Sequence, residues 1–309
     1  MSLTGARRVR LAIAALTLCS GVAVGFQSSH DAPLHDAQLD ISREQQIEAV
    51  RLPLSQLRAG LPADARLRLF TITDQPGLYV MHAPSLAEQG AMFSRVVALL
   101  ERKDMPRDRV VSMGVIAAYA RRFGTDPAGL TAGNNFSSVQ IAYFFEMARR
   151  QHMTLTEGEH ALQTILVRWH LIREESGAWR AVSSRDFLIT IPGLGPAPWG
   201  ETIDVPIRAA ILSHELGHWE YFSDETYARA CREFWWRDLN LSERTEVTRQ
   251  LAGMGYDPSD RIVIDEMQAY LLHTPPPYMP IVDVPGVYGI DTGRMRRQLE
   301  ARIAKDAGK

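Results

Sequence analysis

The pattern of apolar and polar positions predicts a mostly helical protein with a small amount of strand. Residues 67–73 and 78–82 alternate as half-buried strands do, and the turn sequence DQPG separates them. A third strand-like run covers 179–191 and is strongest over 187–191. Spacings of three and four residues, typical of amphipathic helices, predict helices over 41–57, 85–102, 108–123, 137–151, 156–175, 206–222, 224–237, 242–252 and 260–273, and a terminal one from Thr292. The predicted fold class is therefore α+β, with a small mixed sheet.

Composition excludes several classes of protein. The chain has 309 residues, of which 46% are hydrophobic and 23% charged, as in an ordinary soluble globular protein. Its formal net charge is −2, so no strong field attracts nucleic acid or an anionic membrane. We therefore expect no nucleic-acid partner.

The N-terminus has the composition of a secretory signal peptide. Arg7, Arg8 and Arg10 precede an apolar run that extends to about residue 25, and small residues stand just before Phe26. We predict that residues 1–25 are removed and that the protein is exported, either to a periplasm or to the medium. The apolar run is shorter than the ~20 residues that span a bilayer, so no stable membrane span is expected after removal.

Two variants of export remain open. Arg7 and Arg8 also fit a twin-arginine signal, although the residues that follow them match poorly. Cys19 offers a site for lipid attachment, but Leu18 before it is larger than the small residue usual there. Without Cys19 the mature chain retains only Cys231, so it cannot form an internal disulfide.

The predicted elements suggest one folded unit after a short leader. Residues 26–60 are expected to form a linker and an N-terminal helix, and 61–309 a single unit. Within that unit we expect a helical upper part over 84–175, a strand and a helix over 179–222, a further helix over 260–273 and a tail over 278–309.

The chemically distinctive segment is HELGH at 214–218. On a helix, residues four apart lie about 40° apart round the axis, so His214 and His218 leave the same face and can reach one tetrahedral metal ion. Glu215 lies about 100° round from His214, where its carboxylate can take a proton from a water molecule beside the metal. Gly217 is a poor helix residue, so we expect another backbone to pack against that turn. The alternative is a pair of structural histidines without metal.

With this HExxH sequence the chain resembles the zincin superfamily of metallopeptidases. The resemblance implies one Zn²⁺ per chain and a peptide or protein substrate, here outside the cytoplasm. It also implies an edge strand just before the motif helix that runs antiparallel to the bound peptide. Residues 187–191 are the candidate for that strand, and their exposed edge would pair with the substrate backbone.

A downstream acidic residue would complete the site. Glu266 follows His218 by 48 positions, and Ala269 stands three residues later, which resembles the gluzincin pattern with glutamate as third ligand. The match is incomplete, because Tyr270 stands where thermolysin-like members have aspartate. The rival is Asp224, which aligns with the last ligand of the metzincin pattern HExxHxxGxxH, with tyrosine in place of its glycine. Asp265 and Glu225 are the remaining alternatives.

Peptide hydrolysis also needs a group that stabilises the oxyanion. Tyr221 shares the helix face of the two histidines, while Tyr270 and His273 lie one and two turns after Glu266. Each is a candidate, and each also fits a packing role.

These residues predict a zinc peptidase with Glu215 as general base, assisted by Tyr221 or Tyr270 as catalytic residues. Two alternatives remain open. One is a zincin scaffold of the cell envelope that binds a partner and cleaves slowly or not at all. The other is an envelope protein with a structural zinc, although such sites usually have four protein ligands, often cysteines.

Overall fold

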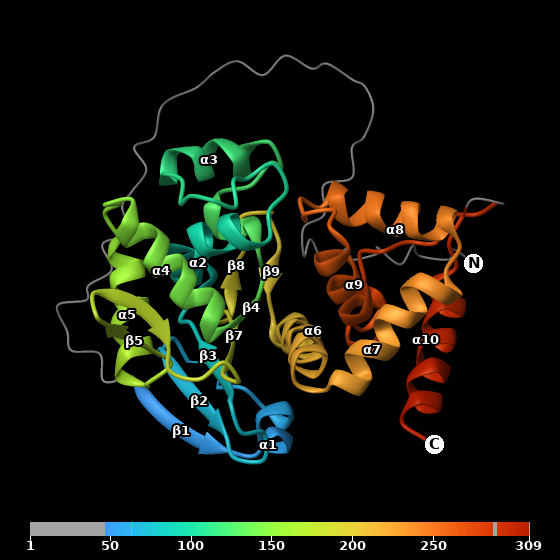
Figure 1. Ribbon diagram of the computed structural model, residues 1–309, viewed down its shortest axis with the longest axis horizontal. Helices are drawn as coiled ribbons and strands as arrows, with labels where there is room; N and C mark the ends of the chain where they lie inside the picture. The colour runs from blue at the N-terminus through green and yellow to red at the C-terminus, as the bar shows by residue number, and fades with distance from the viewer. Residues whose placement is uncertain (1–46, 63, 287–288, 309) are drawn as a thin grey trace, which may run out of the picture.

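The computed structural model describes residues 47–62, 64–286 and 289–308 (Figure 1). The expected signal peptide at 1–25, the first part of the linker and Cys19 lie outside the described residues. No helix in the described part of the chain has the length and hydrophobicity needed to cross a membrane.

The α+β class with a small mixed sheet is confirmed. The main sheet has the strand order β1-β2-β3-β7-β4. Its strands are β1 (Glu48–Leu52), β2 (Arg68–Ile72), β3 (Leu78–His82), β7 (Phe187–Ile191) and β4 (Asn134–Ser137). The pairs β1–β2 and β3–β7 are parallel, whereas β2–β3 and β4–β7 are antiparallel. The hairpin β2–β3 with its turn over 74–77 agrees with the alternation of its residues.

The helix expected over 41–57 is wrong over 48–52, and only residues 54–57 of its described part are helical. Strand β1 occupies 48–52, and a short helix α1 (Leu54–Ala59) follows it. Pro53 separates the two because it has no N–H for a continuous helix, so it stands at the N-cap of α1 instead. Pairing with β2 decides the strand, and that partner lies 20 residues further along the chain.

The strand predicted over 187–191 exists, but its position at the sheet edge is wrong. Strand β7 lies between β3 and β4, and all five of its residues are buried. The edge strands are β1 and β4, and β4 lies in a segment for which no strand was predicted. A strand buried on both faces reads as a continuous apolar run, and this is how Phe187–Ile191 reads.

A separate hairpin corrects two further expectations. Helix α5 (Glu157–Arg168) ends early, and residues expected to continue it form β5 (Ile172–Glu175), which pairs with β6 (Ala178–Ala181). Ser176 and Gly177 connect these strands with φ of 52° and 73°, the positive values that a tight two-residue hairpin turn requires. The run over 179–191 is therefore two strands in different sheets.

Helices cover both faces of the main sheet (Figure 1). One face packs with α2 (Leu86–Leu100), α4 (Ser138–Arg150) and α5, through buried residues such as Leu69, Met81 and Leu188. The opposite face, which includes Phe70, Val80 and Ile189, packs with α6 (Val205–Ser223). Helix α6 thus lies between the sheet and the C-terminal helices.

The described chain from Val205 onward is mostly helical, as expected. It contains α7 (Glu225–Glu233), α8 (Leu241–Gly253), α9 (Asp260–Gln268) and α10 (Thr292–Asp306). Helices α7 and α9 end in π-helical turns, η2 (Phe234–Asp238) and η3 (Ala269–His273). The remaining elements are α3 (Met113–Arg121), two short 3₁₀ turns η1 (Pro127–Leu130) and η4 (Pro276–Tyr278), and the hairpin strands β8 (Gly195–Pro196) and β9 (Thr202–Ile203).

Candidate metal centre

Helix α6 carries the HELGH segment in its second half. Asp204 caps its N-terminus by accepting a hydrogen bond from the N–H of Ile207 at 2.9 Å, and Pro206 stands in the first turn, where no N–H is needed. The helix is buried between the sheet and α9. His214, Glu215 and His218 are consequently only 2%, 4% and 2% exposed.

The outward ring nitrogen of His214 is held by a threonine. Nδ1 of His214 lies 3.0 Å from Oγ1 of Thr274, and this hydroxyl donates to the carbonyl of Ala269 at 3.1 Å. Because the hydroxyl proton is used in that bond, the oxygen accepts from Nδ1–H. Neutral His214 therefore has its lone pair on Nε2, the atom that faces the site.

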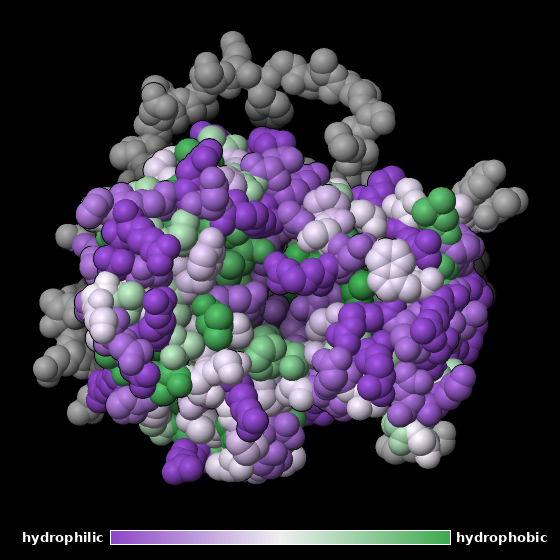
Figure 2. Space-filling view, viewed as in Figure 1, coloured by the Kyte–Doolittle hydropathy of each residue, from purple (hydrophilic) through white to green (hydrophobic). Residues whose placement is uncertain are grey.

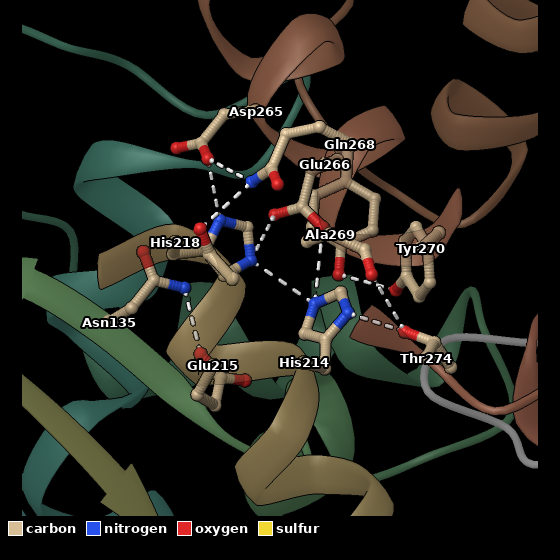
Figure 3. A network of polar contacts seen from close by, with 12 residues as sticks. Asn135, His214, Glu215, His218, Asp265, Glu266, Gln268, Ala269, Tyr270 and Thr274 are labelled. Carbon is tan, nitrogen blue, oxygen red and sulfur yellow. Dashed lines mark hydrogen bonds and ion pairs between the residues drawn. The ribbon is translucent and has the colours of Figure 1, made fainter. Parts of the chain in front are cut away.

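The outward nitrogen of His218 is held by a carboxylate. Nδ1 of His218 donates to Oδ1 of Asp265 at 2.7 Å (Figure 3). Gln268 steadies this carboxylate with a 3.2 Å bond from its amide, which also donates to the carbonyl of Gly217 at 3.2 Å. Nε2 of His218 is thereby turned toward His214.

Glu266 completes the group from α9. The two Nε2 atoms are 3.1 Å apart, and the carboxylate of Glu266 lies 3.6 Å from His214 Nε2 and 3.9 Å from His218 Nε2. Two imidazole lone pairs that face each other at this distance repel unless a cation lies between them. The three buried side chains place their ligand atoms within 4.8 Å of one another and can hold a metal ion. Oε2 of Glu266 is buried without a hydrogen-bond partner in the described chain, which fits an atom that binds a metal.

The three side chains, together with Asp265, shift one another's pKa values. Burial lowers the pKa of His214, whereas at His218 the charges of Asp265 and Glu266 outweigh burial and raise the pKa. Burial opposes ionisation of Glu266, but the neighbouring His218 and His214 lower its pKa. Without metal the histidine pair holds a proton beside an ionised Glu266, and a metal ion would displace that proton.

Glu215 is placed by the segment that leads into β4. Nδ2 of Asn135 donates to its Oε2 at 2.9 Å. Gly133 approaches so closely that a Cβ atom there would stand 2.3 Å from Oε1 of Glu215. Burial raises the pKa of Glu215 to about 8, although the charge of His218 and the Asn135 bond act in the opposite direction. The carboxyl can therefore exchange a proton near neutral pH.

A cavity lies in front of these groups. It is lined by Glu101, Leu130, Thr131, Ala132, Gly133, Asn135, His214, Glu215, Tyr256 and Glu266. Figure 2 shows this face of the molecule hollowed near its centre, between the part built from α2–α4 and the part built from α8 and α9. Burial and the charge of Glu266 raise the pKa of Glu101 to about 7. The cavity wall is thus acidic and partly protonated at neutral pH.

Gly217 faces a side chain and not the expected backbone. A Cβ atom on Gly217 would lie 2.6 Å from Cδ2 of the His273 ring. His273 is held there by Tyr227, whose hydroxyl is 3.0 Å from Nε2 of His273. Glycine at this helical position therefore admits an imidazole ring from η3.

The expected oxyanion-stabilising residues Tyr221, Tyr270 and His273 are not among those that line the cavity. Tyr221 bonds Arg232, and the hydroxyl of Tyr270 lies 3.0 Å from that of Tyr256. The ring of Tyr270 packs against His214 with centroids 4.4 Å apart. Tyr256 is the phenol that reaches the cavity wall.

The alternative third ligands are engaged elsewhere. Asp224 caps α7, where it accepts hydrogen bonds from the N–H groups of Thr226 and Tyr227 at 2.8 and 3.1 Å. Glu225 pairs with Arg232. Asp265 accepts the hydrogen bond from Nδ1 of His218, so it orients this candidate ligand and does not face the metal site itself.

Sequence reasoning missed four residues of the site: Glu101, Asn135, Tyr256 and Thr274. They come from the end of α2, from β4, from the loop before α9 and from the residue after η3. The only local signal is the Gly133-Asn134-Asn135 cluster, which is rich in small and polar side chains but reads equally as a turn. The other three, Glu101, Tyr256 and Thr274, do not stand at a distance from the HELGH segment that a known pattern would predict.

Comparison of the chain with models of protein families, with curated proteins and with solved structures finds no match. The function is therefore inferred from the geometry of the site.

Proposed function

We propose that the protein is a zinc-dependent peptidase of the zincin type, with the gluzincin-like ligand set His214, His218 and Glu266. The observation that carries this proposal is the convergence of two imidazole Nε2 atoms, 3.1 Å apart, on a buried carboxylate from a second helix. Ligand atoms of a tetrahedral zinc ion with bonds of about 2.0–2.1 Å lie about 3.3 Å apart. Two nitrogens and one oxygen are a donor set that zinc prefers, and a site with three protein ligands is typical of catalytic zinc.

A bound zinc ion would supply Lewis acidity and make a water molecule nucleophilic near neutral pH. Glu215 would take the proton from that water and later deliver it to the leaving amine. Burial raises its pKa to about 8 and the amide of Asn135 fixes one carboxylate oxygen, so both protonation states are accessible in one orientation.

Tyr256 is our candidate for hydrogen bonding to the developing oxyanion. It lines the cavity, and burial followed by the charge of Glu266 raises its pKa well above 10, so its hydroxyl keeps the proton that it must donate. Tyr270 lies behind it as a hydrogen-bond partner and positions it. Tyr221 remains a second candidate through its place on α6.

An extended peptide is the substrate that the free edge of β4 favours. The free edge of β4 is continuous with the segment 131–135 that lines the cavity, and no described strand pairs with that edge. A peptide can add to such an edge through main-chain hydrogen bonds, and this would bring its carbonyl groups in front of Glu215. The N-terminal residues support a substrate outside the cytoplasm.

The test combines metal analysis with peptide hydrolysis. Purified protein should hold about one zinc per chain, and Glu215→Gln should retain the zinc and lose turnover, because it removes the base and leaves the ligands. Hydrolysis by Glu215→Gln at the wild-type rate would contradict the mechanism. Zinc binding without hydrolysis of any peptide in a library would favour the binding scaffold.

A further inference from the structure

Glu101 lines the cavity of the metal centre but has no role in the mechanism proposed above. It stands at the C-terminal end of α2 and shares the cavity wall with His214, Glu215 and Glu266. It is not among the described residues whose ligand atoms converge on one point, so it is not a fourth ligand of the same metal ion. Its carboxylate makes no hydrogen bond and no ion pair with any described residue.

The backbone of Glu101 is fixed against the loop that carries Tyr256. The N–H of Asp257 donates to the carbonyl of Glu101 at 2.8 Å. The next residue, Arg102, pairs with Tyr256 in an antiparallel β-bridge. Glu101 and Tyr256 are therefore held together at the same cavity wall, and the position of the carboxylate does not depend on a mobile segment.

The nearest arginines do not neutralise Glu101. The guanidinium of Arg102 donates to two backbone carbonyls, and that of Arg261 donates to the carbonyl of Leu100 at 3.4 Å. Charged groups that are withdrawn from water are normally paired. Burial and the charge of Glu266 raise the pKa of Glu101 to about 7, and a bound cation would favour its ionised form.

The cavity has room for only a small cationic group. The space in it that is open to the centre of a water molecule is about 10 Å³, close to what one water molecule needs. An ammonium group is compact, whereas a guanidinium group is a larger planar fork. Because Glu101 shares this one space with the candidate ligands and with Glu215, a group that it binds would lie beside the bond to be cleaved.

We propose that Glu101 binds the α-ammonium group of the first residue of the substrate, so that the peptidase removes residues from the N-terminus of a peptide. This inference rests on the proposed function, because it specifies the substrate of the same site. The α-ammonium group stands on the carbon next to the first peptide carbonyl, which is the group attacked by water. Only the residues after the cleaved bond would then extend along the free edge of β4.

Other charged groups of a peptide fit this wall less well. The ammonium group of a lysine side chain stands at the end of a four-carbon stem, which needs a deeper space than this cavity offers. The carboxylate at the C-terminus of a peptide would be repelled by Glu101.

The first experiment compares the hydrolysis of trialanine amide with that of its N-acetylated form by the zinc-loaded protein. We expect the wild type to release alanine from the free peptide and to prefer it to the acetylated peptide in kcat/KM by about 10–100-fold, the effect of one charged hydrogen bond. Glu101→Gln should remove this preference, mainly through a higher KM for the free peptide. Glu300→Gln, which changes an exposed glutamate of α10, should keep it.

Two outcomes of this experiment overturn the inference. One is equal hydrolysis of the free and acetylated peptides by the wild type. The other is faster hydrolysis of an acetylated peptide that contains lysine than of trialanine amide, which would assign Glu101 to a side chain.

The second experiment measures binding without turnover. Calorimetry with zinc-loaded Glu215→Gln should show trialanine amide bound about 10–100-fold more tightly than its acetylated form, and the further change Glu101→Gln should abolish the difference. Equal affinity for the two peptides overturns the inference. The two proposals can fail separately. If the free peptide binds preferentially but the wild type hydrolyses no peptide, the peptidase function fails and the binding role of Glu101 stands. If free and acetylated peptides are hydrolysed equally, the peptidase function stands and the role of Glu101 fails.

Discussion

The carboxylate of Asp265 accepts a 2.7 Å hydrogen bond from Nδ1 of His218, and the next residue, Glu266, faces Nε2 of the same ring at 3.9 Å. Two consecutive residues of α9 therefore act on opposite sides of one imidazole. The first fixes the tautomer and orientation of the ring, and the second joins it at the metal site.

Asp265→Asn should weaken zinc binding without removing a ligand. An amide cannot match the charge that favours Nδ1–H of His218, so we expect affinity to fall by about 10–100-fold. Competition with a chromophoric chelator measures this. Asp257→Asn serves as the control, because Asp257 pairs with Arg107 away from the ligands. An unchanged affinity in Asp265→Asn would mean that its bond does not orient His218.

Removal of the two rival ligands should have unequal effects. Glu266→Ala deletes the carboxylate that faces both histidines. Loss of a group that only orients a ligand lowers metal affinity by up to about 100-fold, so loss of this ligand should reduce zinc affinity by more than about 100-fold. Asp224→Ala should leave zinc content unchanged and cost about 1 kcal/mol of stability, since it removes the N-cap of α7. Zinc titration and urea unfolding of both variants decide it. Loss of zinc in Asp224→Ala, with zinc retained in Glu266→Ala, would show that Asp224 and not Glu266 is the third ligand.

Gly133→Ala should abolish the proposed peptidase activity, because it displaces Glu215. The new Cβ would stand 2.3 Å from Oε1 of Glu215, so the carboxylate must move away from its bond with Asn135. We expect kcat to fall on the order of 100-fold with zinc retained, because a displaced general base loses most of its contribution. Gly253→Ala is the control, since its Cβ would meet nothing within 4 Å. Full activity in Gly133→Ala would show that Glu215 is not held where the structure places it.

His82 should make the protein less stable in acid. Burial, followed by the charge of Arg208, lowers its pKa from 6.5 to about 4. The unfolded chain then binds a proton at higher pH than the folded one, so this contribution is complete above pH 6.5 and is lost as pH falls toward 4. The loss reaches about 3 kcal/mol at the acid end. His82→Gln should therefore show a flatter dependence of unfolding free energy on pH, measured by urea titration. If unfolding free energy depends on pH equally in the wild type and in His82→Gln, His82 is not the cause of the lower stability in acid.

Local geometry explains what could be predicted for the site. His214 and His218 converge because they are one helical turn apart, and this depends on no other part of the chain. The same holds for the β2–β3 hairpin, where alternation and a four-residue turn lie within 15 residues. Glu266 was predicted from a resemblance, and the structure brings it to the histidines.

Contacts between segments that are distant in the chain explain the errors. Whether a strand lies at an edge depends on which distant segment pairs with it, and β4 reaches β7 across about 50 residues. The bond from Asn135 to Glu215 spans 80 positions, so no periodicity could indicate it. The strand β1 depends likewise on pairing with β2, which outweighs a weak helical spacing.

The sequence alone therefore determined the chemistry that one helix can present: two imidazoles on one face and a carboxylate beside them. Only the tertiary structure decided which groups surround them. Thr274 and Asp265 orient the rings, and Asn135 orients Glu215. These contacts join residues from different elements, and their positions follow from the packing of the whole core and not from neighbouring residues in the chain.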